Sequence, residues 1–220
     1  MHPIVKSILS WLVTLLAPFA ILLLGVRLLL VPDFLRVEYR MPGFPADTYG
    51  FSTDDRIRWA TPTLEYLAND QGISYLAGLM FDNGQPIYNA RELSHMQDVK
   101  TVLQAILTIW GWELLFLAAL GIWAWEGDWR EAYQSGWRWG GFLTILLLAG
   151  FGIFAATSFW DFFSWFHSLF FRGDTWLFAY SDTLIRLFPI RFWEDCFIYI
   201  AGVSVIVGLA LGLGLKPKAK

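Results

Sequence analysis

Two histidines, His95 and His167, are the side chains of this sequence best suited to moving protons. Histidine is the side chain whose ordinary pKa lies between pH 5 and 8, so near neutrality it can act as a general base or a general acid. His95 precedes one long apolar run, in "NARELSHMQDVK", and His167 follows another, in "FHSLFF". The third histidine, His2, lies in the N-terminal tail, and we expect it to take no part in chemistry.

Arg91, His95 and Asp98 would share one face of a helix, because they are four and three residues apart. Asp98 or a neighbouring acid could fix the tautomer of His95, and Arg91 could bind an anionic headgroup or a developing oxyanion. Polar residues beside an apolar segment are also commonly solvated caps of that segment. Arg91 and Asp98 are therefore candidate substrate-binding residues, and their roles are hypotheses.

Glu113 and Cys196 are weaker candidates. Glu113 lies in the middle of an apolar run, where a carboxylate is costly, but a protonated and hydrogen-bonded acid would explain it as well as a function would. Cys196 could accept an acyl group as a thiol, or it could be a small buried apolar residue. As the only cysteine it excludes an internal disulfide and a cysteine-rich metal centre. The roles of Glu113 and Cys196 stay open.

Composition indicates the class of protein that holds these residues. Of 220 residues 56% are hydrophobic and 18% are aromatic, and several apolar runs approach the thickness of a bilayer. The chain is therefore predicted to be an integral membrane protein. Its net charge of −3 includes no cluster of basic and aromatic residues, so nucleic acid is not an expected partner.

Four membrane spans are predicted, at about 8–31, 101–125, 139–160 and 196–215. An even number of spans places both termini on one side, and lysines near the two ends mark that side as cytoplasmic. These lysines are Lys6, Lys216, Lys218 and Lys220. Residues 32–100 and 161–195 then face outward, and we treat residues 1–220 as one membrane domain.

Residues 32–100 are predicted to form most of a small mixed α/β cap, to which loop 161–195 adds. "FLRVEYR" alternates like a strand, "STDDRIRWATPTLEYLAND" has the cap and first turn of a helix, and "LMFDNGQPIY" carries an Asn-Gly hairpin signal. The predicted fold class is thus a mainly α integral membrane protein with four transmembrane helices and a mixed α/β extracytoplasmic cap.

Spacing along the helices predicts that the two histidines lie at the same depth. Asn89 and Glu92 form a capping-box-like start, so one helix is expected to run from about residue 90 through the second span. Thirty residues separate His95 from Trp125, and thirty separate His167 from Trp137. If each helix is unbroken, both imidazoles lie about 45 Å from the inner tryptophans, at the outer interface. Ester carbonyls of glycerolipids lie at that level.

The segments "YNARELSHMQDVK" and "FHSLFFRGDTWLFAYSDTLIRLFPIRFWED" resemble the Lit family of bacterial integral membrane proteins, the lipoprotein intramolecular transacylases, and the resemblance covers nearly the whole chain. It implies that the protein moves the sn-2 acyl chain of a diacylglyceryl-modified lipoprotein to the α-amine of the same N-terminal cysteine. It also implies that His95 and His167 are catalytic. The implied location is the bacterial cytoplasmic membrane, with the site on the outer face and membrane lipids around it. No cofactor or metal is expected.

Two other classes of function fit parts of the sequence. Two histidines on antiparallel helices could be axial ligands of a b-type haem, and His95, His167 and Asp98 with an outer acid could hold zinc. A Soret band would identify the haem protein, and sensitivity to chelators would identify the metal site. A non-catalytic membrane protein that binds a partner through its outer cap is the structural alternative.

Overall fold

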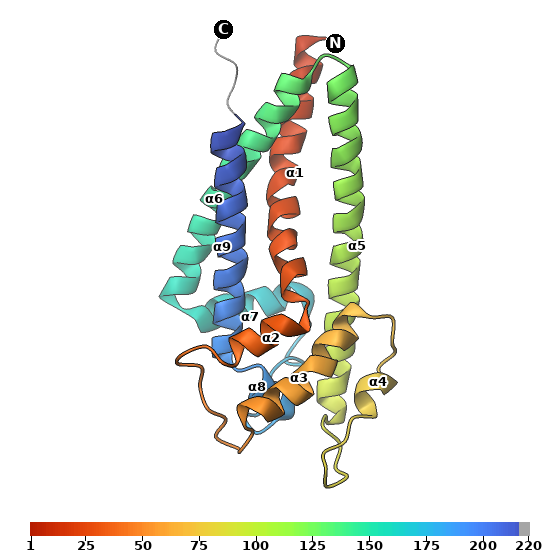
Figure 1. The fold of residues 1–220 in the computed structure, drawn as a ribbon, viewed down its shortest axis with the longest axis vertical. Coiled ribbons are helices and arrows are strands. Elements are labelled where there is room, and N and C mark those ends of the chain that lie inside the picture. Colours follow the sequence, from red (N-terminus) through yellow and green to blue (C-terminus); the bar gives the residue numbers. More distant parts are fainter. Residues whose placement is uncertain (216–220) are drawn as a thin grey trace. The chain divides into compact units, whose positions relative to one another are not determined.

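The computed structural model describes residues 1–215, and the regular secondary structure within them consists of helices joined by loops (Figure 1). Four helices are long and apolar enough to cross a membrane: α1 (Pro3–Leu29), α5 (Ala90–Glu126), α6 (Arg130–Thr157) and α9 (Ile190–Gly214). The short helices are α2 (Pro32–Glu38), α3 (Thr53–Ala68), α4 (Ser74–Ala77), α7 (Phe159–Phe170) and α8 (Thr183–Leu187). The prediction of a multi-pass integral membrane protein with four spans is confirmed. Lys216, Lys218 and Lys220, which oriented the predicted topology, lie outside the described residues.

The chain divides into two compact units. The span unit comprises Met1–Arg27, Ile106–Ser158 and the chain from Ile198 onward, and the histidine unit comprises Leu28–Ala105 and Phe159–Phe197. Helix α5 contributes its first residues to the histidine unit and its remainder to the span unit.

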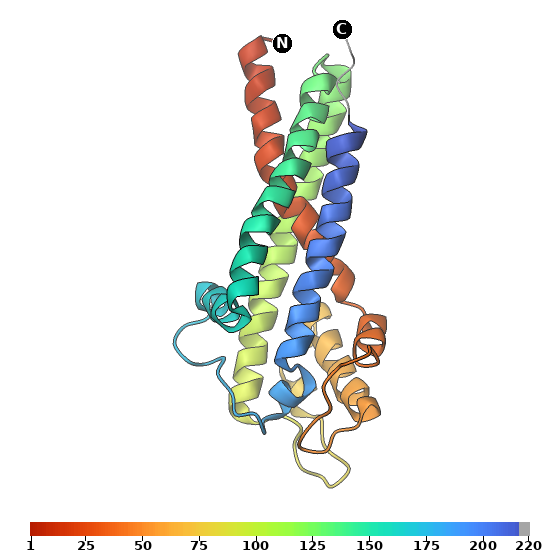
Figure 2. The ribbon, with the colours of Figure 1, turned by 90° about the vertical axis from the view of Figure 1, so that its left-hand side faces the viewer.

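Helices of the span unit lie close together (Figure 2), and small residues permit this close approach. A Cβ atom built on Gly140 would lie 2.4 Å from the Cβ of Ala17 in α1, and one built on Gly141 would lie 2.5 Å from the carbonyl oxygen of Gly208 in α9. In lipid the helices gain little from hydrophobic association, so close backbone contact and hydrogen bonds must hold them. Thr14 accordingly donates to the carbonyl of Gly136 at 3.2 Å.

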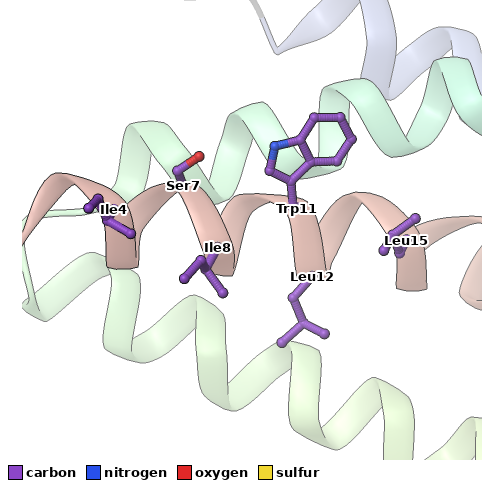
Figure 3. Close-up of a pocket in the computed structure, with 6 residues that line it drawn as sticks. All are labelled: Ile4, Ser7, Ile8, Trp11, Leu12 and Leu15. Carbon is purple, nitrogen blue, oxygen red and sulfur yellow. The ribbon is translucent and has the colours of Figure 1, made fainter.

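The opposite side of α1 carries a stripe of exposed apolar side chains. Ile4, Ile8, Trp11 and Leu15 recur every three or four residues and line a shallow, almost wholly apolar depression (Figure 3). Side chains at this spacing share one face of a helix. In a membrane-spanning helix such a face contacts lipid, so the exposure of these residues agrees with the assignment of α1 as a span.

An apolar cluster holds the histidine unit together, with helix α3 lying beside α2, α4 and α8. Ser52 caps α3 through a reciprocal pair of bonds with Asp55, which confirms the helix start predicted from "STDDRIRW". Tyr66 of α3, Leu76 of α4 and Leu187 of α8 are almost completely buried in this cluster.

The prediction of a mixed α/β cap was wrong, because no β-strand forms among residues 1–215. "FLRVEYR" is helical in α2: Pro32 occupies the first turn, where its missing N–H costs nothing, and Leu35 and Tyr39 then face the core one turn apart. The Asn-Gly turn does form, with Gly84 at φ +80°. Its arms make only one isolated bridge, between Met80 and Pro86, and a proline cannot extend a ladder of hydrogen bonds.

The assumption that the third span continues unbroken to His167 was also wrong. Helix α6 ends at Thr157, Ser158 is extended with φ −160° and ψ 104°, and α7 starts at Phe159. Helix α5 is continuous from His95 to Trp125, so the predicted distance of about 45 Å between a histidine and the inner tryptophans holds for that helix alone.

Candidate active site

Glu92 fixes the start of α5, one turn before His95. Its Oε2 accepts from the backbone N–H of Asn89 at 2.8 Å, while Oδ1 of Asn89 accepts from the N–H of Glu92 at 3.0 Å. Its Oε1 accepts from the backbone N–H of Leu184 at 2.6 Å. Glu92 is only 1% exposed, so these bonds replace the water that its carboxylate has lost. The predicted capping box is therefore present, and the same carboxylate also ties the start of α8 to α5.

Helix α7 positions His167. Its apolar residues Phe162 and Phe163 are buried together with His167, and these positions are four or five residues apart on one side of the helix. His167 lies in the last turn, where its carbonyl accepts from the N–H of Phe171 at 2.8 Å. Its ring is therefore held by the packing of α7 and not by a continuation of α6.

The two imidazoles face each other inside the histidine unit. Their ring centroids are 6.3 Å apart with planes inclined by 24°, and His95 and His167 are 6% and 8% exposed. The ring of Phe171 contacts both, with centroids 5.0 Å from His95 and 5.6 Å from His167. Phe178 packs on His95 at 5.4 Å, and Trp176 packs on His167 at 4.7 Å. The pair thus lies in an aromatic enclosure.

Hydrogen bonding assigns the tautomer of His167. Its Nδ1 lies 2.9 Å from the carbonyl oxygen of Phe163, and because a carbonyl can only accept, Nδ1 carries the proton. Burial lowers the pKa of His167 from its ordinary value, and the bond to Phe163 opposes this only in part. The ring is therefore neutral at pH 7 and presents the lone pair of Nε2.

His95 has a different environment. Its Nδ1 is buried and, within the described part of the chain, has no hydrogen-bond partner. Because Nδ1 is sealed from solvent, Nε2 is the nitrogen left for a substrate. Asp98 is exposed, and no bond joins it to His95 in residues 1–215, so the tautomer of His95 is not fixed by that carboxylate. No group of three His, Cys, Asp or Glu side chains gathers at metal-binding spacing in that same stretch.

A loop of residues 171–182 covers the imidazoles and is tied to α5 by Arg91. Nη2 of Arg91 donates to the carbonyl of Asp174 at 2.5 Å, and its guanidinium lies 5.6 Å from the ring centroid of Phe178. Gly173, at φ +65°, permits the turn that this contact requires. Arg91 therefore holds the loop that carries Trp176 and Phe178.

Sequence reasoning found the two histidines but missed the enclosure around them. The turn at "RGDTW" brings Trp176 onto His167, and Phe178, two residues further along, packs on His95. Arg91 is near the pair by way of this loop, whereas Asp98 points to solvent. Cys196 and Glu113 are both buried.

The model of the family "Lipoprotein intramolecular transacylase Lit" matches residues 11–193. The chain belongs to the Lit family. It is therefore a membrane-integral acyltransferase of lipoproteins, and the resemblance noted in the sequence is confirmed.

Individual similar proteins match nearly the whole length of the chain. A protein of Aquifex aeolicus (strain VF5), described as uncharacterised, is 28% identical over 221 residues, covering 97% of this chain and 96% of its own. The structure of the transacylase Lit from Bacillus cereus has a TM-score of 0.78 at 19% identity, covering 96% of this chain and 94% of that one. A variant of the Bacillus cereus protein with one histidine replaced by arginine has a TM-score of 0.70. At 19% identity these structures show a common fold.

Proposed function

We propose that this protein transfers the sn-2 acyl chain of a diacylglyceryl-cysteine to the α-amine of the same cysteine, with His95 and His167 as the acid–base pair. The observation that carries the proposal is the pair of facing imidazoles, both buried and with centroids 6.3 Å apart. Family membership supplies the class of substrate, a lipoprotein.

The proton balance of this reaction suits two neutral imidazoles. The amine nitrogen forms a bond to the ester carbonyl carbon, the bond from that carbon to the glycerol oxygen breaks, and one proton passes from nitrogen to oxygen. A free α-amine has a pKa near 8, so a base must take its proton as the tetrahedral intermediate forms. One imidazole accepts that proton, and the imidazolium so formed gives a proton to the glycerol oxygen, either directly or through the second imidazole, so that both rings end neutral.

The enclosure supports the same chemistry in two ways. Amine and ester belong to one substrate molecule, so no protein nucleophile is required and the site acts mainly by proximity. The rings of Phe171, Phe178 and Trp176 exclude water, which would otherwise compete with the amine for the carbonyl. Arg91, which borders the enclosure, is placed to bind an anionic headgroup or the oxyanion.

The site is proposed to lie at the outer surface of the cytoplasmic membrane. His95 is separated from Trp125 by thirty residues of one continuous helix, about the thickness of a bilayer with its headgroups. Lys6, at the far end of the span unit from that outer surface in the proposed topology, is consistent with a cytoplasmic N-terminus.

Replacement of each histidine by alanine tests the mechanism. The variants His95→Ala and His167→Ala are expressed in a host without native lipoprotein N-acylation, and the lipoprotein N-terminus is analysed by mass spectrometry. We expect the lyso form to fall by about 10² to 10⁴, the usual contribution of general acid–base catalysis.

The matched control is His2→Ala, which removes the exposed tail histidine and should leave the yield of lyso form unchanged. Undiminished product from both His95→Ala and His167→Ala would exclude the pair as catalysts. A wild-type protein that yields no lyso form from any lipoprotein would exclude the reaction itself.

A further inference from the structure

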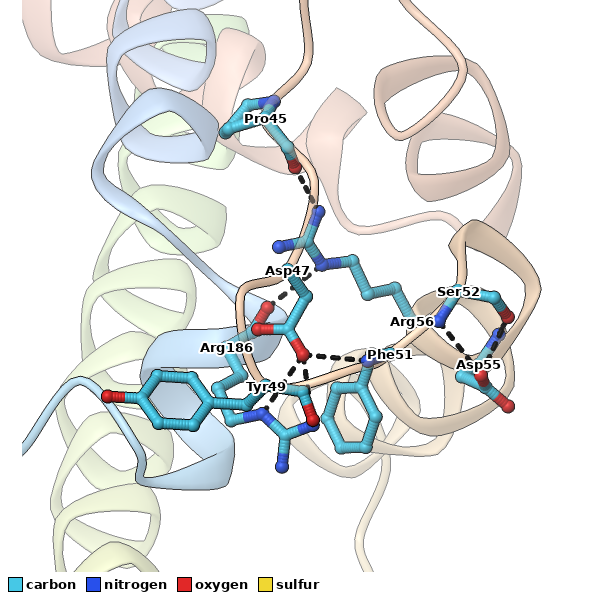
Figure 4. Close-up of polar contacts among 8 residues, drawn as sticks. All are labelled: Pro45, Asp47, Tyr49, Phe51, Ser52, Asp55, Arg56 and Arg186. Carbon is cyan, nitrogen blue, oxygen red and sulfur yellow. Dashed lines mark hydrogen bonds and ion pairs between the residues drawn. The ribbon is translucent and has the colours of Figure 1, made fainter.

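The histidine unit contains a second polar site, a cleft of about 360 Å³ next to α8 (Figure 4). Its wall includes Pro45, Asp47, Tyr49, Arg56, Tyr180 and Arg186. The volume lies within the range of ligand-binding pockets, and the site is separate from the aromatic enclosure because neither imidazole lines it.

The wall of this cleft is rigidly built. Oδ2 of Asp47 accepts from Nε and Nη2 of Arg186 at 3.1 and 2.9 Å, and from the backbone N–H of Phe51 at 2.7 Å. Arg186 also lies over the ring of Phe51. Burial opposes ionisation of Asp47, but its bonds to Arg186 and the backbone prevail and lower its pKa. Asp47 is thus ionised at neutral pH.

The cleft has an excess of positive charge. Arg56 is only 5% exposed and donates to backbone carbonyls, to that of Arg186 at 3.0 Å and to that of Pro45 at 2.5 Å. Within the described residues no carboxylate lies within ion-pair distance of it. Because Asp47 is engaged by Arg186, the cleft holds two guanidinium groups and one carboxylate.

The rim of the cleft offers an amphipathic surface. Tyr180 is 82% exposed, and Tyr49 is also exposed. Tyrosine rings give apolar contact area with a polar end, which suits them to binding peptide side chains. Nη1 of Arg186 has no partner within residues 1–215, so a donor remains for a peptide carbonyl.

The cleft and the imidazoles belong to one framework. Phe178 packs on His95, and Tyr180, two residues further along the same loop, lines the cleft. Two residues span at most about 7 Å. Asp182 closes this loop by accepting from the N–H of Ala179 at 2.9 Å. On the other side of the cleft, Arg186 lies in α8, whose start is tied to Glu92 in α5.

We propose that this cleft binds the peptide that follows the modified cysteine of the lipoprotein, and that it prefers acidic or uncharged side chains there to basic ones. The inference rests on the proposed function, because that function places the cysteine amine at the imidazoles. An extended peptide advances by about 3.3 to 3.6 Å per residue. The second to fourth residues after the amine therefore span about the distance from the imidazoles to Tyr180. The unbalanced guanidinium charge then selects among their side chains.

Charge reversal at the rim tests the inference. Tyr180→Glu and Tyr180→Lys change an exposed position, so both variants should fold. Each is assayed as full-length protein with two lipoproteins that differ only in carrying Asp or Lys at the two residues after the modified cysteine. We expect the wild type to convert the Asp substrate with a kcat/KM about threefold to fivefold higher, the size of a surface charge interaction. Tyr180→Lys should widen this ratio, and Tyr180→Glu should narrow or invert it.

Gln85→Glu and Gln85→Lys are the matched controls, since Gln85 is exposed in the same unit and does not line the cleft. They should leave the ratio unchanged. Equal conversion of both substrates by the wild type, or a ratio that is the same in both Tyr180 variants, would overturn the inference while leaving the proposed reaction intact. Absence of lyso product from every substrate would instead contradict the proposed reaction.

Discussion

The span unit and the histidine unit are stabilised by different interactions. In the span unit glycines such as Gly140 and Gly141 allow helices to approach until their backbones touch. In the histidine unit buried charged groups, above all Glu92 and Arg56, bond to backbone atoms of distant segments. Removing a buried charged side chain should therefore lower the stability of the histidine unit, whereas adding a side chain at a close-packed glycine should lower the stability of the span unit.

The difference follows from what each unit must accomplish. Helices that cross a membrane satisfy their own backbone groups and need only fit together. The histidine unit must order loops, whose backbone groups have no helix partners, around two imidazoles. Side-chain carboxylates and guanidinium groups supply those partners.

The largest loss of stability is expected from a change at Glu92 in the histidine unit. Glu92→Ala removes the acceptor of two backbone N–H groups, those of Asn89 and Leu184, and should lower the free energy of unfolding by roughly 3 kcal/mol. Asp70→Ala, at an exposed carboxylate of the same unit, should change it little. Thermal unfolding in detergent measures both. Equal melting temperatures for the two variants would show that the buried carboxylate does not organise the unit.

Two glycine substitutions in α6 should change the stability of the span unit in different directions. Gly140→Ala places a Cβ 2.4 Å from that of Ala17 and should cost about 1 to 3 kcal/mol of stability. Gly150→Ala in the same helix meets no atom within 4 Å, so it should be neutral or stabilise by up to about 1 kcal/mol. Melting temperatures of the two purified variants give the result. The close-packing account fails if they shift in the same direction.

Arg91 should have a smaller effect, on activity. Arg91→Gln releases the loop that carries Trp176 and Phe178, and we expect kcat/KM for lyso-lipoprotein formation to fall about tenfold, as misplacement of a site element does. Cleavage of the loop by protease should become faster. The control is Arg58→Gln, which breaks a surface pair with Asp82 in the same unit. Lower activity with an unchanged rate of cleavage would show that Arg91 does not act by holding the loop in place.

The smallest effect is the dependence of stability on pH. Burial lowers the pKa of His167 in the folded protein, so below about pH 6.5 the unfolded chain binds more protons at this residue. Stability contributed by His167 is thus present above that pH and is lost as the pH falls, by no more than about 1.4 kcal/mol per pH unit. His167→Gln should flatten a melting series from pH 8 to pH 5, and His2→Gln should not. A steeper slope in His167→Gln would contradict the sign.

Local pattern was sufficient for much of the fold. The four spans, the cap of α3 at Ser52 and the capping box of Asn89 and Glu92 each depend on residues near one another in the chain, and all three were predicted. Strands were predicted wrongly for the opposite reason. Whether "FLRVEYR" pairs as a strand or winds as a helix depends on distant partners, and here Tyr39 finds its partner in the carbonyl of Leu187.

Hydropathy and residue chemistry are properties of single segments, so the amino-acid sequence was enough to predict a membrane protein and the two histidines that could move protons. How those histidines meet depends on packing between segments distant in the chain. The helix that was expected to lift His167 ends at Thr157, and the packing of α7 against the start of α5 brings the rings together instead. Loop residues such as Trp176 and Tyr180 acquire their places in the same way, from contacts between segments that no local pattern encodes.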